Sequence, residues 1–491
     1  FSEKHNLTLI AGYNYEAKYY RDLTAANDGL LSEDLSDFNL AKGTTNFTLN
    51  GGRNEYAIMG WFYRAAYDYK GKYLAEVNGR YDGTSRFPRG KRYGFFPSFS
   101  AAYRISEEAF FEPLRKTVDN LKIRLSYGSL GNQQIGYYDF IQTITTKGSM
   151  GDYSFDGTIL GQHATVSDPV SGNQTWEKVI SKNLGADLNM FSNRLSLTAD
   201  FYIRDTKGIL GKGKSLPSIY GANEPQVNSN NLRTKGYELV LGWRDSFKLA
   251  GSTFSYGITG TFSDYTAEYT KCDNPSGLIG GPYVGKKYGE IWGYKVDGLF
   301  RNDEEAAEYA SRVDLSKVAA GYYSATGAYG KGVRGGDIKY LDLDGSGIVD
   351  GGKGTLEDPG DRRVIGNSSP RYQYGLTLNL SWYGFDLSVF MQGIGRLDWY
   401  PGADNLRFWG PYSRPYATFI PKNFMSQVWS ESNPDAYLPR ARAYTSLNST
   451  QGTAYYTNDR YLQNLAYCRL KNLTLGYTIP KLSLIHIFEP T

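Results

Sequence analysis

The chain has little cysteine and histidine, and this argues against several classes of site. Among 491 residues there are two cysteines, Cys272 and Cys468, and three histidines, His5, His163 and His486. Nothing in this usage indicates a disulfide framework, and no histidine spacing is typical of a metal site or a His-based catalytic site. No nucleophile motif is visible, and the acidic residues are too numerous to single out a glycosidase pair. The sequence therefore does not predict an enzyme.

Long apolar runs and a charge imbalance are also missing. No segment approaches the roughly 18 consecutive apolar residues of a membrane-spanning helix, which excludes helical membrane proteins but leaves a membrane barrel open. The formal net charge is +4 with both signs mixed, so no nucleic-acid partner is predicted. The chain begins at Phe1, without Met or a signal peptide, and enters a strand almost at once. We therefore expect an internal fragment, from which export cannot be deduced.

What the sequence does contain is a repeated alternation of apolar and polar residues. In the segment 371–382, every second residue from Tyr372 to Trp382 is Tyr, Leu or Trp, and those between are polar or Gly. Successive side chains of a strand point to opposite faces, so this strand has one apolar and one polar face. An apolar face packs on a second sheet in a soluble sandwich and meets lipid in an outer-membrane barrel. The 43 tyrosines favour the barrel, because Tyr and Trp concentrate at membrane interfaces.

The alternation predicts about a dozen strands, joined by tight turns at one end and long loops at the other. Tight turns occur at 69–72, 191–194 and 382–385, whereas 130–178, 207–232, 267–370 and 397–464 are long connections. This asymmetry is typical of an up-and-down barrel of the outer membrane. We therefore predict an all-β fold, an antiparallel transmembrane β-barrel with long extracellular loops. The predicted strands are 6–20, 55–70, 72–83, 96–105, 120–129, 179–191, 194–206, 233–247, 252–266, 371–383, 384–396 and 465–479.

Several motifs occur along these strands in a fixed order. They are 67–74 (YDYKGKYL), 80–87 (RYDGTSRF), 93–98 (YGFFPS), 126–133 (SYGSLGNQ), 176–178 (WEK), 193–196 (NRLS), 335–340 (GGDIKY), 364–367 (VIGN) with Pro370, and 470–477 (LKNLTLGY). In these motifs the chain resembles the barrel of SusC/RagA-like TonB-dependent outer-membrane transporters. Their order and spacing match throughout, so the resemblance covers nearly the whole chain.

The resemblance implies both a fold and a function. It implies a roughly 22-stranded barrel whose lumen holds a plug domain, located in the cell outer membrane of Bacteroidetes-type bacteria. It also implies TonB-dependent import of glycans or peptides, with a SusD-like lipoprotein closing over the barrel mouth as a lid. We expect residues 1–480 to be a partial barrel domain, because the plug, the segment that contacts the TonB complex and the first strands are missing. Residues 481–491 match nothing in the family, and we interpret them as an aberrant tail.

Residues 342–350 (DLDGSGIVD) resemble the first nine positions of a calcium-binding loop, with oxygen ligands and a glycine in the expected places. The twelfth position holds Lys353, where a bidentate Glu belongs. Two alternatives stay open: a structural calcium that orders the loop, or an Asp/Gly-rich surface loop without an ion. No cofactor is required for function in either case. The candidate ligands are Asp342, Asp344, Ser346 and Asp350, and the candidate substitutes for the missing Glu are Glu357, Asp358 and Asp361.

Three loop tryptophans are predicted to bind substrate: Trp292, Trp399 and Trp409. Aromatic faces stack on sugar rings, and three long loops would bring these residues to the extracellular mouth. The alternative for each of them is packing within the loops or a place in the girdle of aromatic residues at the membrane interface. The substrate itself cannot be derived, because specificity would lie in the loops, the plug and the lid.

Other features of the sequence leave different functions to be weighed. Residues 208–215 (GILGKGKS) match the phosphate-binding P-loop pattern, but prolines follow where a helix is needed, so a Gly/Lys-rich loop is favoured. The segment 303–320 is the one good helix candidate, with an acidic first turn. The main alternative to an importer is a surface-exposed all-β protein that binds or degrades carbohydrate. A passive porin is a third alternative, which the long aromatic loops and the family motifs disfavour.

Overall fold

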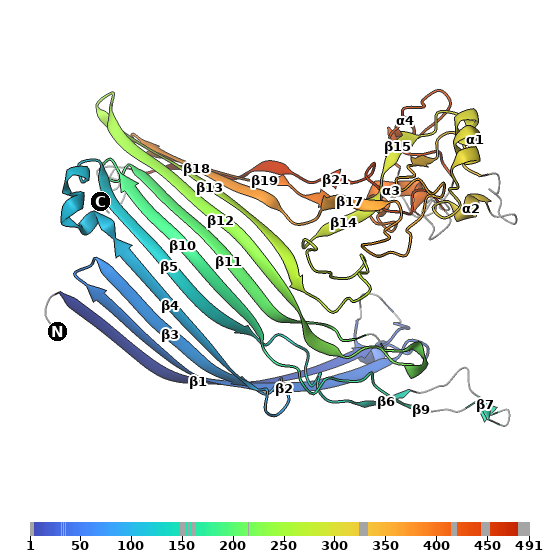
Figure 1. Cartoon of the computed structure of the whole chain (residues 1–491), viewed down its shortest axis with the longest axis horizontal. Helices are drawn as coiled ribbons and strands as arrows, with labels where there is room; N and C mark the ends of the chain where they lie inside the picture. Colours follow the sequence, from blue (N-terminus) through green and yellow to red (C-terminus); the bar gives the residue numbers. More distant parts are fainter. Residues whose placement is uncertain are drawn as a thin grey trace. The chain divides into compact units, whose positions relative to one another are not determined.

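Twelve long strands form one sheet in the computed structural model, and each pairs with its neighbours along the chain (Figure 1). The structure describes residues 4–30, 32, 34, 36–147, 154–155, 158–159, 163–214, 216–323, 332–413, 420–442 and 452–479. All twelve predicted strands are present, which confirms the all-β prediction. The strands are β1 (His5–Ala26), β2 (Thr48–Tyr69), β3 (Tyr73–Thr84), β4 (Tyr93–Arg104), β5 (Val118–Asn132), β10 (Glu177–Met190), β11 (Leu195–Lys212), β12 (Gln226–Leu249), β13 (Ser252–Lys271), β18 (Arg371–Trp382), β19 (Phe385–Arg396) and β22 (Tyr467–Tyr477).

The two ends of the strands differ in their connections, as predicted. At one end β2–β3, β12–β13 and β18–β19 are joined by tight turns that contain residues with positive φ: Lys70 and Gly71, Ala250 and Gly251, Tyr383 and Gly384. Such turns match the twist of the flanking strands. At the other end lie the long connections, of which 272–370 and 397–466 carry most of the additional structure. Short turns at one end and long loops at the other are the rule in outer-membrane barrels, and this sheet shares that asymmetry.

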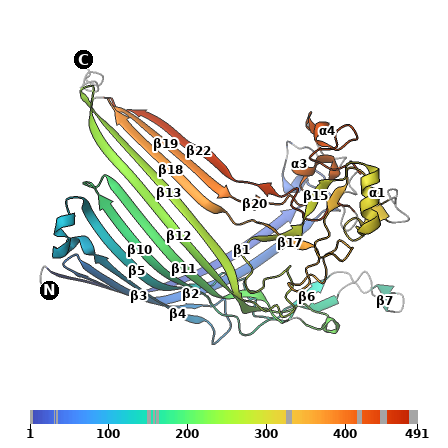
Figure 2. The same cartoon turned by 45° about the horizontal axis from the view of Figure 1, so that its top comes forward.

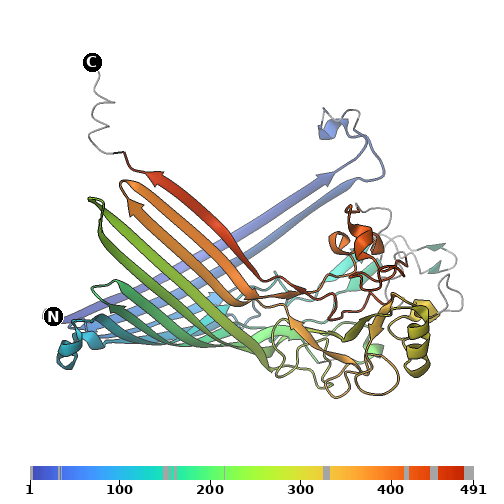
Figure 3. The same cartoon turned by 90° about the horizontal axis from the view of Figure 1, so that it is seen from above.

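The chain divides into two compact units. The first comprises residues 1–116, 120–186 and 202–233, and the second comprises residues 117–119, 187–201 and 234–491. In the first unit, β1 and β2 continue past the end of β3 (Figure 3). In this extension, residues 48–57 of β2 pair with β1 alone. In the second unit, β13, β18, β19 and β22 run side by side and lead into the folded loops (Figure 2).

The apolar stripes of the strands are not covered by protein. Phe201, Leu376 and Leu473 are 56%, 43% and 61% exposed, and most strands carry similar residues. A large exposed apolar surface marks an interface with a membrane or a partner. No second sheet packs face to face against this one among the described residues. The apolar face is therefore the lipid-facing face of a barrel wall, and the sandwich arrangement is excluded for the described part of the chain.

The main hydrophobic core lies in the long loops of the second unit. We call this folded region the loop lobe: the described residues between 272 and 370 and between 397 and 466. Its core contains fully buried Phe300, Tyr340, Trp409 and Tyr461. The lobe is built from β14 (Glu290–Tyr294), β15 (Val296–Leu299), β16 (Ile338–Tyr340), β17 (Arg362–Asn367), β20 (Asp398–Trp399), β21 (Gln463–Asn464), α1 (Asp303–Arg312), α2 (Ala320–Tyr323), α3 (Leu406–Trp409), α4 (Phe424–Gln427) and the 3-10 turn η5 (Gly410–Tyr412).

Helix α1 is shorter than the predicted 303–320. Asn302 caps it by accepting a hydrogen bond from the backbone N–H of Glu305 at 2.9 Å, and three acidic residues occupy its first turn, as its sequence indicates. It ends at Arg312 because Val313 is extended and Asp314 forms a parallel bridge with Ile348. Among the described residues, no helix is long and apolar enough to cross a bilayer.

The first unit has its own short elements in the connections between strands. A small core of Phe87, Phe96 and Trp176 lies at the long-loop end of this unit. The indole N–H of Trp176 donates to the carbonyl of Arg92 at 2.9 Å, which ties the start of β10 to the β3–β4 connection. The short elements are β6 (Ile144–Lys147), β7 (Ser154–Phe155), β8 (Thr158–Ile159), β9 (His163–Val166) and the 3-10 turns η1 (Phe38–Leu40), η2 (Ile105–Glu107), η3 (Ala109–Leu114) and η4 (Ser218–Tyr220).

Candidate functional site

Trp292, the first predicted substrate-binding residue, lines a cavity of about 330 Å³ in the loop lobe. It lies on β14 opposite Val364 of β17, just after a register shift between Ile291 and Trp292. The other walls are the glycine-rich turn 351–354 and the side chains of Arg362 and Tyr456. An aromatic ring, a guanidinium and a glycine-rich backbone turn together suit a ring-shaped polar ligand.

Two buried tyrosines of this part of the lobe stay neutral. Burial raises the pKa of Tyr294, which lines the cavity, to about 12. Burial also raises the pKa of Tyr283 to about 12, with a further contribution from its 2.7 Å hydrogen bond to Glu290. Neither hydroxyl ionises near neutral pH, so these groups donate and accept hydrogen bonds but do no acid–base chemistry there.

The other two predicted tryptophans lie elsewhere in the lobe. Trp399 is on β20, opposite Gln463 of β21, and is 36% exposed. Trp409 is fully buried at the end of α3, where its indole N–H donates to the carbonyl of Pro401 at 3.1 Å and its ring lies 5.0 Å from that of Tyr461. The structure therefore does not bring the three rings into one cavity, and Trp409 packs the lobe core. Ligand contact by Trp292 and Trp399 stays a prediction.

The predicted calcium loop brings three carboxylates together, and only two of them are predicted ligands. Carboxylate oxygens of Asp342, Asp344 and Asp361 lie within 4.8 Å of one another. Asp361 is fully buried and accepts hydrogen bonds from the backbone N–H groups of Leu343 at 2.6 Å and Asp350 at 2.9 Å. It is one of the three residues considered as a substitute for the missing Glu.

The remaining two predicted ligands of the loop make other contacts. The hydroxyl of Ser346 donates to the carbonyl of Ile348 at 3.0 Å. The carboxylate of Asp350 accepts from the backbone N–H of Gly352 at 2.7 Å. Burial raises the pKa of Asp361, and the charge of Asp344 adds to this effect, so a cation bound beside these carboxylates would favour the ionised form of Asp361. Whether the loop holds calcium stays a prediction.

A buried pair of charged residues joins two distant segments of the lobe, and the sequence did not predict it. Arg442 donates to Asp337 through Nε at 3.0 Å and Nη2 at 2.6 Å, and both residues are buried. The guanidinium also lies 4.0 Å from the ring centroid of Tyr322. Burial raises the pKa of Asp337 to about 6, against the opposing effect of Arg442. The available signal was the motif 335–340, in which Asp337 follows two glycines.

Close packing explains Gly336, the second glycine of this motif. Gly336 has a φ of +85°, and a Cβ on it would lie 2.4 Å from the ring of Trp429. Only glycine combines this backbone conformation with so close an approach. The motif therefore fixes the position of the chain that carries Asp337 to Arg442.

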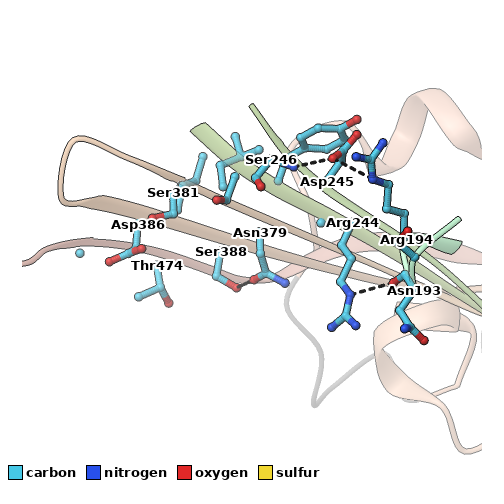
Figure 4. A pocket seen from close by; sticks show the side chains of 17 residues that line it. Asn193, Arg194, Arg244, Asp245, Ser246, Asn379, Ser381, Asp386, Ser388 and Thr474 are labelled. Carbon is cyan, nitrogen blue, oxygen red and sulfur yellow. Dashed lines mark hydrogen bonds and ion pairs between the residues drawn. The ribbon is translucent and has the colours of Figure 1, made fainter. Parts of the chain in front are cut away.

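A second cavity, of about 790 Å³, lies at the short-turn end on the polar face of the second unit (Figure 4). Arg244 donates to the carbonyl of Asn193 at 3.0 Å, and Arg194 pairs with Asp245 at 3.3 Å. Ser388 donates to Asn379 at 2.9 Å. This cavity has both charge signs and many hydrogen-bonding groups, as expected of a wall that lines a wet lumen.

The structure of the segment 208–214 does not fit a phosphate-binding P-loop. Residues 208–212 continue β11 as a strand, and Gly208 is held at a φ of +69° while Asn228 donates to its carbonyl at 2.6 Å. A phosphate-binding loop needs a helix directly after it, and the next described element is the short 3-10 turn η4. The resemblance of 208–215 to a nucleotide site therefore reflects composition alone.

An amphipathic up-and-down sheet with short turns at one end, a folded lobe at the other and a polar inner face defines the class: a wall of a transmembrane β-barrel. The family comparison is in agreement. Residues 1–484 match the family described as TonB dependent receptor-like, beta-barrel, and the chain belongs to this family. It is thus an outer-membrane barrel segment, as the sequence motifs predicted.

Curated relatives and solved structures agree with this assignment. The chain is 26% identical to TonB-dependent receptor P3 of Formosa agariphila, over 97% of this chain and 44% of the relative. It is 23% identical to TonB-dependent receptor SusC of Bacteroides thetaiotaomicron, over 87% of this chain and 38% of the relative. The structure of the RagAB peptide importer in the open-open state has the same fold, with a TM-score of 0.71, 20% identity, and coverage of 98% of this chain and 47% of that one. The chain spans less than half the length of these proteins.

Proposed function

We propose that this chain forms part of the wall and the extracellular lobe of a TonB-dependent importer of glycans or peptides. One observation carries the proposal: the apolar face of the sheet is exposed, while the hydrophobic core lies in loops at a single end. Such a protein presents a rigid, aromatic-rich surface above a membrane-embedded wall. The RagAB peptide importer, which has the same fold, supports peptides as one substrate class, and glycans are implied by the resemblance of the sequence motifs to the SusC/RagA family.

The proposed partners follow from the resemblance of the sequence motifs to the SusC/RagA family. A SusD-like lipoprotein would close over the long-loop end as a lid, and a TonB complex would supply energy through a part of the protein outside this chain. The lobe is suited to hold a lid, because its buried core and its ion pair between Asp337 and Arg442 keep the surface in one conformation.

The experiment is uptake of labelled glycans and peptides by cells that carry or lack the full-length gene. We expect uptake of one substrate class to require the gene, the TonB complex and the SusD-like lipoprotein. Uptake that persists without TonB would indicate a passive porin instead. Release of smaller sugars by the purified full-length protein would favour the alternative of a degrading enzyme, which we do not propose.

We further propose that calcium orders the loop 342–361 and with it one wall of the Trp292 cavity. The carboxylates of Asp342, Asp344 and Asp361 support this role, since calcium takes several carboxylate oxygens. The same loop contains the turn 351–354, which lines the cavity. An ion at the carboxylates would therefore favour a single conformation of that wall.

Calcium titration of the full-length protein tests this proposal. We expect binding that is lost in Asp361→Asn and kept in Asp358→Asn, because Asp358 lies on the same loop but outside the carboxylate cluster. Amide exchange within 342–361 should slow when calcium is added. Equal binding by both variants, or no change in exchange, would show that the loop functions without the ion.

A further inference from the structure

Positive charges gather on the lipid-facing side of the first unit, where the apolar stripes of β10 and β11 end. On β10, Leu184 is 52% exposed, and Lys182 follows it on the same face toward the long-loop end. On β11, Ile203 is 39% exposed, and Asp205 and Lys207 follow it on the same face. The two strands are neighbours in the sheet. The change from apolar to charged side chains therefore occurs at the same end of both strands.

Arg233 of β12 completes the group and fixes its geometry. Its guanidinium donates to both oxygens of Asp205, through Nε at 2.6 Å and Nη2 at 3.3 Å. Asp205 also interacts electrostatically with Lys182 and Lys207. One carboxylate thus holds three cations around it. Positive charge remains in excess, because a single carboxylate balances only one of the three.

The lysines are not used elsewhere in the fold. Both Lys182 and Lys207 are exposed. In the described part of the chain, neither ammonium makes an ion pair or a hydrogen bond within the usual distance. The group also lies on the apolar face of the sheet, opposite the polar inner face, so a role in lining the lumen does not account for it.

We infer that Lys182, Lys207 and Arg233 form a binding site for the phosphate-bearing head group of a lipid in the extracellular leaflet. Lysine and arginine bind phosphate through charge-assisted hydrogen bonds. The exposed side chains of Leu184 and Ile203 lie below the cations, where acyl chains of the same lipid would pack. A free phosphate would use the cations but not the apolar residues, and this contrast commits the site to a lipid. Asp205 would act as a positioning residue that orients Arg233.

The test uses the full-length protein in phosphatidylcholine nanodiscs, with lipid A as the probe. Binding of lipid A that carries its phosphates is compared with binding of enzymatically dephosphorylated lipid A and with competition by inorganic phosphate. Each lysine near a charged membrane surface contributes about 1 kcal/mol, which is roughly fivefold in affinity. We expect Lys182→Gln and Lys207→Gln each to weaken binding by about that factor.

Control variants separate this site from general effects of charge or folding. Lys18→Gln removes an exposed lysine from the opposite, inner face of β1 and should leave lipid binding unchanged. The double variant Lys182→Arg with Lys207→Arg keeps both charges and should therefore keep lipid A binding. If this variant also lost binding, the loss in the Gln variants would reflect misfolding and not the missing charge. Equal binding of phosphorylated and dephosphorylated lipid A would overturn the inference. Full competition by inorganic phosphate would also overturn it, because a free phosphate uses only the cations, and the apolar residues would then contribute nothing to binding.

Discussion

At the scale of single residues, the structure places the predicted substrate-contact residue Trp292 beside a cavity. Replacement by Ala removes a ring face that a sugar or a peptide side chain would cover. We expect Trp292→Ala to weaken uptake by roughly fivefold, equivalent to about 1 kcal/mol of lost aromatic contact. Trp292→Phe should retain most of the uptake. The measurement is the concentration dependence of uptake by cells that express the full-length protein.

Trp409 provides the contrast to this prediction. Because its ring is fully buried, Trp409→Ala should lower the stability of the lobe by about 3–5 kcal/mol and reduce expression and uptake together. A Trp409 variant that folds normally but loses only ligand affinity would show that its ring reaches the ligand after all. Unchanged uptake in Trp292→Ala would show that the Trp292 ring serves packing only.

The pair of Asp337 and Arg442 makes the stability of the lobe depend on pH. The pKa of Asp337 is raised by burial from 3.8 to about 6, so the folded lobe favours the protonated carboxyl. This contribution is fully present below pH 4 and is lost as the pH rises through 6. We expect amide exchange at 332–341 to show a less stable lobe at pH 7 than at pH 4, after correction for intrinsic rates.

Two variants check the origin of this pH dependence. Asp337→Asn should abolish this pH dependence, because an amide does not titrate, and should hold the lobe near the stability that it has at pH 4. Glu308→Gln removes an exposed partner of Arg312 on α1 and should change neither quantity. Protection that increases between pH 4 and pH 7 would contradict the expected loss of stability.

Site residues were harder to predict than strands, for physical reasons. Asp342 and Asp344 could be proposed as calcium ligands because they belong to one short local pattern. Asp361 lies outside that pattern and could be proposed only as one of three candidates. The ion pair of Asp337 and Arg442 joins residues 105 positions apart, and no local pattern reveals such a contact. Trp409 was misjudged as exposed because a single sequence does not distinguish a ring in a folded loop from one at its surface.

At the scale of elements, the strands were predictable because lipid imposes a two-residue period on each of them. The predicted 371–383 and the observed β18, Arg371–Trp382, agree almost residue by residue. β12 extends from 226 rather than 233, because polar residues such as Asn228 pair beyond the apolar stripe, where no alternation marks them. The short ladders of the lobe were missed, since three-residue strands such as β16 carry no period.

Charge on one face of β18 should therefore act differently from charge on the other. Leu376 is 43% exposed on the lipid-facing side, and its neighbour Thr377 lies on the inner face opposite Thr259. We expect Leu376→Arg to destabilise the barrel by about 2–4 kcal/mol and Thr377→Arg to be tolerated. Heat-modifiable migration of the full-length protein from outer membranes measures assembly. Equal assembly of both variants would mean that the two faces do not differ in their surroundings.

At the scale of the whole molecule, apolar groups are divided between two environments. The apolar face of the sheet is exposed and faces lipid, whereas the lobe buries its apolar side chains in a core of its own. This division distinguishes a barrel wall from a soluble protein, in which the apolar faces of the strands would themselves form the hydrophobic core. It follows that the bilayer stabilises the sheet, whereas the lobe depends on its own packing and on the Asp337–Arg442 pair.

The tryptophans report this division directly. Trp61 and Trp382 are exposed on the apolar face of the strands, and the indole of Trp243 donates to Tyr256 on that face at 3.2 Å. Brominated lipids quench the fluorescence of rings that they touch. In the full-length protein, we expect Trp61→Phe, Trp243→Phe and Trp382→Phe each to remove part of the quenching. Trp409→Phe should lower total fluorescence and leave the quenched part unchanged. Quenching that depends on Trp409 and not on the strand tryptophans would mean that the lobe, rather than the sheet, contacts the bilayer.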